Sequence, residues 1–123
     1  MKTTLFLAIM TVIVVTSGNL YGQHEEKKVV VDGVNINELK DVEYVQLLGL
    51  FDHGKLVIEV DYGQPLTESQ IIAAADGHAQ TFESMIGALN FMHKNGWEFL
   101  NAFEIKGQGQ GNVYHFILKR IDQ

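Results

Sequence analysis

Residues 82–97 carry the clearest helical pattern of the chain. Five apolar residues in this segment recur with the helical period and would share one broad face, with Phe91 at its edge: Met85, Ile86, Ala88, Leu89 and Met92. His93 and Lys94 place positive or potentially positive charge at the negative end of the helix dipole, and Gly96 can adopt the left-handed conformation that ends a helix. The pattern predicts one amphipathic helix whose apolar face needs a sheet to cover.

A strand is predicted directly after this helix, because apolar and polar residues alternate from Trp97 onward. On this alternation one side of the strand carries Trp97, Phe99, Phe103 and Ile105, and the other carries Glu98, Leu100, Ala102 and Glu104. We expect the Trp97 side to pack on the helix. In the last strand, residues 113–121, Tyr114, Phe116 and Leu118 would then face the helix, while Val113, His115 and Ile117 face away.

Three further strands are predicted, at residues 29–31, 42–50 and 55–62. Asp32-Gly33 and residues 52–54 are turn signals, so a hairpin joins the second and third of these strands. Asn37 is expected to cap a brief helical turn, and residues 63–77 show no clear pattern. The order predicts an α+β fold, with a mostly antiparallel sheet of four to five strands and one main helix packed on one face.

The N-terminus has the pattern of a secretory signal peptide over residues 1–22, followed by one domain over residues 23–123. Lys2 supplies a short positive region, residues 5–15 an apolar run and residues 16–22 a small and polar tail. Cleavage is expected after Gly22, with Gly18 as an alternative. A membrane anchor is the competing interpretation, but the run is shorter than a span requires. The sequence therefore predicts a periplasmic or secreted protein without a stable membrane span after cleavage.

Composition narrows the possible partners. Removing residues 1–22 leaves 123 − 22 = 101 residues with a formal charge of 8 − 15 = −7. This acidic balance argues against nucleic acid and anionic membranes as partners. The sequence contains no cysteine, which excludes disulfides and a lipid-modified cysteine. The two basic pairs, Lys27-Lys28 and Lys119-Arg120, are interpreted as solvated strand ends.

Four groups of residues could carry chemistry, and each has a simpler interpretation. The glycine-rich residues 107–111 lack the following helix that a phosphate loop needs. The histidines, His24, His53, His78, His93 and His115, lack the short spacing of a zinc site, although Asp52 and Asp76 lie near two of them. The acidic pairs Glu59 with Asp61 and Glu98 with Glu104 are expected to be solvated. Ser69 and Ser84 have no nucleophile motif. The sequence therefore assigns no catalytic, cofactor-binding or metal-ligating residue and no cofactor.

Aromatic residues could form a stacking platform for bases or sugars: Trp97, Phe99, Tyr114 and Phe116. We expect them to be buried under the helix instead.

Several segments resemble known proteins. VVVDGVNINELKDVEYVQLLG, IEVDYGQ, SMIGALNFMHKNGWEFLNAF and VYHFILKR are similar to a group of small exported proteins of unknown function from Bacteroidota. The helix, the GWE segment and the terminal LKR also resemble domain-of-unknown-function family 4177, over the last third of the chain. The resemblance implies export and a compact α+β domain, and no activity, cofactor or site residue.

Two functions from different classes remain. The first is a non-catalytic binding or interaction domain of the cell envelope, which contacts a protein partner or a second copy through the sheet face opposite the helix. On that face we expect Leu100, Ala102, Ile117, Val57 and Leu47 among Glu59, Glu98, Glu104 and His115. Residues 63–77 or the N-terminal segment could cover this face instead. The alternative function is a small hydrolase or metal-dependent enzyme whose site is assembled only in the fold.

The domain is expected to fold without a metal or cofactor, because about 100 residues with an aromatic and β-branched core can be stable unaided. The measurement is the melting temperature with and without a chelator. A decrease of many degrees would contradict this expectation.

Overall fold

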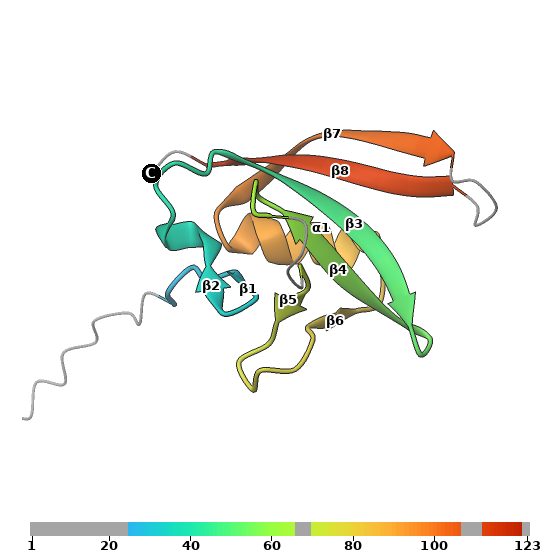
Figure 1. Ribbon diagram of the computed structural model, residues 1–123, viewed down its shortest axis with the longest axis horizontal. Helices are drawn as coiled ribbons and strands as arrows, with labels where there is room; N and C mark the ends of the chain where they lie inside the picture. Colours follow the sequence, from blue (N-terminus) through green and yellow to red (C-terminus); the bar gives the residue numbers. More distant parts are fainter. Residues whose placement is uncertain (1–24, 66–69, 107–111, 122–123) are drawn as a thin grey trace, which may run out of the picture.

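The computed structural model describes residues 25–65, 70–106 and 112–121. The expected signal peptide, the glycine-rich residues 107–111 and Ser69 lie outside these residues. The elements follow the order β1 (Val30–Val31), β2 (Val34–Asn35), η1 (Ile36–Glu38), β3 (Tyr44–Asp52), β4 (Lys55–Asp61), β5 (Ile72–Ala73), β6 (Thr81–Phe82), α1 (Met85–Lys94), β7 (Trp97–Lys106) and β8 (Asn112–Arg120) (Figure 1).

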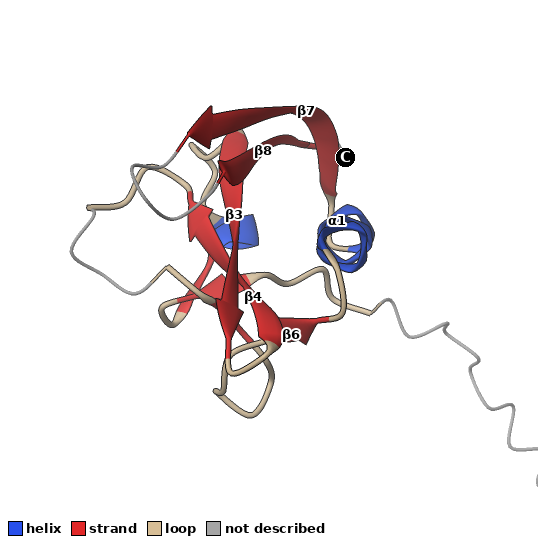
Figure 2. Ribbon diagram, turned by 90° about the vertical axis from the view of Figure 1, so that its right-hand side faces the viewer, coloured by secondary structure: helices blue, strands red, loops and turns tan. Residues whose placement is uncertain are grey.

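The strands form two antiparallel sheets in the described part of the chain, rather than the single sheet that we predicted. A five-stranded sheet has the order β6-β4-β3-β8-β7, and a three-stranded sheet has the order β2-β1-β5. The larger sheet is strongly curved, and α1 lies inside the curve, opposite β3 (Figure 2). The α+β class is confirmed, whereas the helix fills the space enclosed by strands instead of covering one flat face.

Two predicted turns are present. His53 and Gly54 have φ angles of 47° and 78°, and Asp32 and Gly33 have φ angles of 48° and 75°. Two consecutive residues with positive φ match the right-handed twist of the strands that they join, and Asn, Asp and Gly tolerate this conformation best. The Asp-Gly and His-Gly pairs therefore set the β1–β2 and β3–β4 hairpins.

The helix α1 begins three residues later than its pattern suggested, because Phe82 belongs to β6. The side chain of Ser84 caps the helix by accepting a hydrogen bond from the backbone N–H of Gly87. At the other end Gly96 has a φ of 93°, as predicted for the residue that ends the helix. The predicted apolar face needs one correction, since the side chain of Ile86 is 64% exposed.

The core lies between α1 and the concave side of the large sheet. Ala88 and Met92 of the helix are fully buried, and Leu89, Met85 and Phe91 pack against the buried cluster. The strands contribute buried residues at alternate positions: Val45, Leu47, Leu56, Ile58, Val60 and Leu118. The helix approaches β3 closely at Gly49, where a Cβ would lie 2.5 Å from the Sδ of Met85, so a larger residue there would require the Met85 side chain to move.

Residues 63–77, which showed no pattern, include β5. Glu59 of β4 forms an isolated bridge with Ile71, and the backbone N–H of Val60 donates to the carbonyl of Gln70 at 2.7 Å. This segment therefore runs beside β4 and links the small sheet to the large one. Val57, which we expected on an open face, is only 3% exposed.

Arg120 connects the end of the chain to its beginning, which corrects its interpretation as a solvated strand end. Its Nε donates to the carbonyl of Val42 at 2.9 Å, and its Nη atoms donate to three carbonyls of the η1 segment: those of Asn37 at 2.9 Å, Ile36 at 3.1 Å and Leu39 at 2.8 Å. The carbonyls of Ile36 and Leu39 also accept backbone hydrogen bonds, from Leu39 at 3.3 Å and from Val42 at 3.2 Å. The planar guanidinium adds several donors in a fixed geometry and so ties this turn to the end of β8.

Trp97 joins the same network. The guanidinium carbon of Arg120 lies 4.8 Å from the centroid of the Trp97 ring, and the indole N–H donates to Oδ1 of Asn37 at 3.1 Å. The Nδ2 of Asn37 in turn donates to the carbonyl of Asn95, the residue that ends α1, at 2.7 Å. Asn37 therefore links η1 to the end of the helix, while Asn35 is the residue that caps η1.

We expect Arg120→Lys to destabilise the domain by roughly 2 kcal/mol or more, because lysine keeps the charge but cannot reach four carbonyls and stack on Trp97. The matched control is Lys119→Met, because Lys119 makes only an outer ion pair with Glu43 at 3.7 Å; its loss should cost less than about 1 kcal/mol. Denaturant unfolding measures both values. Equal losses would contradict a central role for Arg120.

A second pair of substitutions tests the helix face. Met92→Ala should cost roughly 2 to 5 kcal/mol, because Met92 is fully buried and its loss leaves a cavity. Ile86→Ala should change the free energy of unfolding by less than about 0.5 kcal/mol, since alanine favours the helix and the isoleucine is exposed. Circular dichroism during denaturant unfolding distinguishes the two. A larger effect at Ile86 would mean that the helix is rotated from this position.

Candidate functional site

A β-bulge in β7 changes which residues face the helix. Phe99 lies opposite Leu118 of β8, but the next pair is Asn101 with Ile117, so that Leu100 is an extra residue in β7. Beyond this point Ala102 pairs with Phe116 and faces the helix side, and Phe103 pairs with His115 and faces outward. The side chain of Asn101 accepts a hydrogen bond from the N–H of Ala102 at the bulge.

The predicted alternation of β7 is therefore wrong after Phe99. Phe103 and Ile105 lie on the outer face, and Ala102 and Glu104 lie on the side of Trp97. Leu47, which we expected on the sheet face opposite the helix, is instead fully buried in the core. Five members of that expected set are placed on the outer face as predicted: Val57, Glu59, Glu98, His115 and Ile117.

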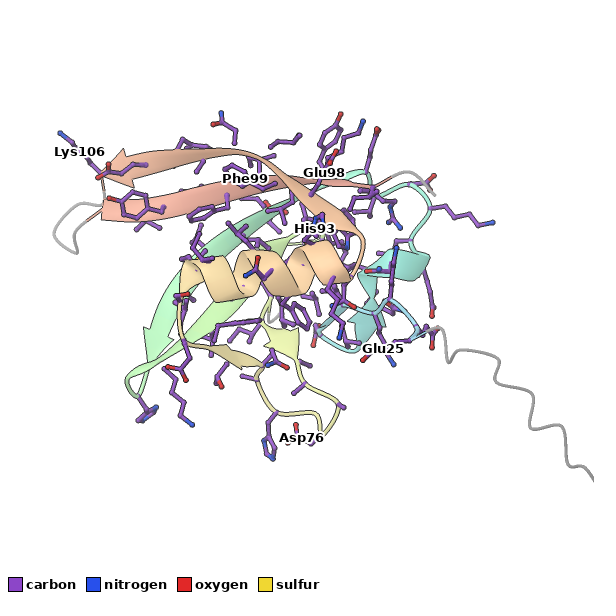
Figure 3. The ribbon with its side chains drawn as sticks, turned by 180° about the vertical axis from the view of Figure 1, so that it is seen from behind. Glu25, Asp76, His93, Glu98, Phe99 and Lys106 are labelled. Carbon is purple, nitrogen blue, oxygen red and sulfur yellow. The ribbon has the colours of Figure 1, made fainter. Side chains whose placement is uncertain are left out.

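The large sheet divides into two hairpins at one end. Where both strands are described, β3 pairs with β8 from Tyr44 to Leu48, and Leu48 lies opposite His115. Beyond this pair β3 continues to Asp52 beside β4, and β8 runs to its other end at Asn112 beside β7. Figure 1 shows the two hairpins diverging, and Figure 3 shows that the tip of the β7–β8 hairpin, marked by Lys106, projects beyond α1. This hairpin is therefore supported by the sheet at its base alone.

Exposed apolar side chains are concentrated on the β7–β8 hairpin. Of eight exposed large apolar residues among those described, five belong to it: Phe99 (49%), Leu100 (48%), Phe103 (41%), Ile105 (50%) and Tyr114 (54%). Nine of the ten residues of β7 are exposed, and Trp97 is the exception. Single exposed apolar residues are common, so the distinctive feature here is that most of them lie on one hairpin.

The hairpin is apolar on both of its faces. On the side toward the helix, the rings of Phe99 and Phe116 lie 6.1 Å apart, and Tyr114 follows toward the tip. On the outer side, the rings of Phe103 and His115 are stacked at 5.0 Å with an interplanar angle of 6°, and Ile105 pairs with Val113. The Nδ1 of His115 is buried without a hydrogen-bond partner among the described residues. Its ring thus packs as part of the apolar surface.

The expected burial of the four aromatic residues holds for only part of the group. Trp97 is fully buried and Phe116 packs against the core, but about half of Phe99 and of Tyr114 is exposed. Phe99 lies on the edge strand β7, and Tyr114 lies beyond the last β3–β8 pair, so each lacks a neighbouring strand on one side that would help to cover it. Asn101 interrupts the apolar alternation of β7 and is the local signal of the bulge in the sequence. Asn101 alone does not determine at which residue of β7 the bulge occurs.

Charged side chains flank the apolar residues of the hairpin. Glu98 lies opposite Lys119 in the β7–β8 pairing, and Lys119 also contacts Glu43. Glu104 lies opposite Tyr114, and Lys106 lies opposite Asn112 at the tip. Glu104 therefore faces no cation across the strand pair.

The other candidate residues do not converge. Among the described residues there is no group of three or more histidine and acidic side chains that could hold a metal ion. Asp76 accepts a hydrogen bond from the backbone of His78 in its own turn, and Ser84 caps α1. Figure 3 shows His93 on the helix and Asp76 on a distant turn.

A groove with a volume of about 760 Å³ lies at the end of the molecule away from the hairpin tip. It runs between the N-terminal segment, the turn after β5 and α1, and Phe91, Val30 and Ala74 are among its lining residues. At its rim Lys94 and Glu25 form an ion pair at 2.9 Å. Glu26, Lys27 and Lys28 also line this groove, so charged side chains of both signs surround it.

Comparison of the chain with protein-family models, with curated proteins and with solved structures finds no match. The resemblance described above therefore stays a prediction. None of the described helices is long and apolar enough to cross a membrane.

Proposed function

We propose that this protein is an exported, non-catalytic binding domain of the cell envelope, which contacts a protein partner through the β7–β8 hairpin. One observation carries the proposal: five of the eight exposed large apolar residues in the described ranges lie on this hairpin. They include aromatic side chains, which dominate the energetics of protein interfaces.

The position of the hairpin also supports a binding role. It projects beyond α1, and both of its faces are therefore open to a partner (Figure 3). The charged residues Glu98, Glu104 and Lys106 stand at its margin, as in interfaces with an apolar centre and a polar rim. Trp97, at the base of the same strand, is part of the buried core. We therefore expect that substitutions of the exposed side chains nearer the tip leave the fold intact.

Export rests on the pattern of residues 1–22. The periplasm or the cell exterior is the expected location, and the mature chain should begin at Gln23. Intact mass measurement of the protein recovered from the producing cell tests this part of the proposal. A full-length chain that begins at Met1 would contradict it.

The binding role is tested with Phe103→Thr and Ile105→Thr in one variant. Threonine favours strands, and both original side chains are about half exposed, so we expect the variant to remain folded. Affinity capture from envelope extract should recover a protein with the wild type and lose it with this variant. Thermal unfolding of the variant, followed by circular dichroism, verifies that it is folded.

The matched control is Tyr44→Thr, because Tyr44 is also exposed but lies on β3 at the other end of the sheet. It should capture the same protein as the wild type. Equal capture by all three proteins, or capture of nothing by the wild type, would contradict a binding role for the hairpin.

A further inference from the structure

β7 is the last strand of the five-stranded sheet in the described part of the chain. An edge strand presents a row of backbone N–H and C=O groups that can pair with another strand. After the bulge at Leu100, residues 101–106 of β7 run in regular register with β8, and every one of them is exposed. This six-residue segment, which we call the free edge, contains no proline and no second irregularity, and near its start the N–H of Ala102 donates to Oδ1 of Asn101.

We propose that the free edge of β7 binds an extended segment of a partner protein as an additional antiparallel strand, in which apolar residues alternate with Lys or Arg. This inference rests on the proposed binding function and specifies the partner. The backbone groups of the free edge would supply affinity, and the alternating side chains would supply selectivity.

The side chains of the free edge define the partner's pattern. Residues directly opposite each other in an antiparallel pair lie on the same face of the sheet. Phe103 and Ile105 point to the outer face, so their neighbours on the added strand should be apolar. Glu104 points to the other face and has Tyr114 as its cross-strand neighbour within the hairpin. A lysine or arginine opposite Glu104 therefore supplies the missing opposite charge.

The charge of the whole protein acts in the same direction. The formal net charge is −6, and the free edge itself carries one acidic side chain, Glu104, and one basic side chain, Lys106, at its end. Lys27, Lys28 and Lys94 line the groove at the other end of the molecule. A basic strand is therefore attracted to this edge, whereas an acidic strand is repelled.

A second copy of the chain fits the free edge poorly. In a symmetric antiparallel pair of two β7 strands, the outer faces of both copies lie on the same side of the sheet only if one residue pairs with itself across the two-fold axis. With Glu104 on the axis, the two carboxylates oppose each other, and with Phe103 on the axis, Glu104 lies opposite an alanine. With Ile105 on the axis, Glu104 lies opposite the second copy's Lys106, but the pairing covers three residues of the described strand.

The experiment uses a peptide that is acetylated, amidated and complementary to the free edge: Glu-Val-Lys-Val-Lys-Thr, which places its first Lys opposite Glu104 and its Val residues opposite Ile105 and Phe103. Titration into the ¹⁵N-labelled mature protein is followed by amide chemical shifts. We expect saturable shifts centred on residues 101–106. The charge-reversed peptide Lys-Val-Glu-Val-Glu-Thr should bind at least about tenfold more weakly.

Two controls separate strand pairing from attraction between charges. The same peptide with N-methyl groups on the backbone nitrogens that face β7 keeps its charge but cannot donate those hydrogen bonds, and it should lose at least about tenfold in affinity. In the protein, Glu104→Lys should weaken binding of the basic peptide severalfold. Glu26→Lys changes the net charge equally at the groove end, next to Glu25, and should leave binding unchanged (Figure 3).

Three results would each overturn the inference. The methylated peptide could bind as tightly as the unmethylated one, or the chemical shift changes could fall only on residues outside β7 and β8. The third is a concentration-dependent dimer of the wild type that Glu104→Lys disrupts. These results differ from a failure of the proposed function. If the peptide does not bind but envelope capture still depends on Phe103 and Ile105, the hairpin binds its partner by another geometry, and only strand addition is wrong.

Discussion

The guanidinium of Arg120 is the interaction on which the rest of the structure depends. It joins the end of the last strand to four carbonyls of residues 36–42 and stacks on Trp97. Trp97 is the first residue of β7, and Asn37 connects its indole to the end of α1. One side chain thereby fixes the N-terminal turn, the helix end and the last hairpin against one another. The sequence contains no cysteine, so this network does the cross-linking that a disulfide does in other small domains.

The two ends of the β7–β8 hairpin differ in how far the rest of the domain covers them. At its base, Trp97 and Leu118 are fully buried, and the pairing of β8 with β3 continues to His115. Beyond His115 neither the helix nor β3 covers the strands, and large apolar residues are exposed on both faces. A domain that is well anchored at the base can present such a surface without a loss of its core, which is the arrangement expected of a binding element on a rigid scaffold.

The bulge at Leu100 has a double effect on this surface. It moves Phe103 and Ile105 from the helix side to the outer face, and it ends the regular edge of β7 on the side toward the base. Bulges are one of the devices by which proteins limit pairing at exposed edges. In β7 the bulge leaves residues 101–106 as a short regular segment next to the tip. The proposed pairing with a partner strand is therefore limited to these six residues.

The sequence by itself determined the local elements. The helical period of residues 85–94, the caps Ser84 and Gly96, and the turn residues Asp32-Gly33 and His53-Gly54 act through contacts between near neighbours, and most of the strands follow from alternation. The tertiary structure decided the rest, because the interactions concerned join residues far apart in the chain. Arg120 bonds to carbonyls about 80 positions earlier, a link that no local pattern encodes. The candidate surface depends on a single extra residue in β7, and a shift of one position exchanges the two faces of a strand. Alternation predicted that β7 carries apolar side chains, but only its pairing with β8 decided which of them the helix covers and which remain exposed.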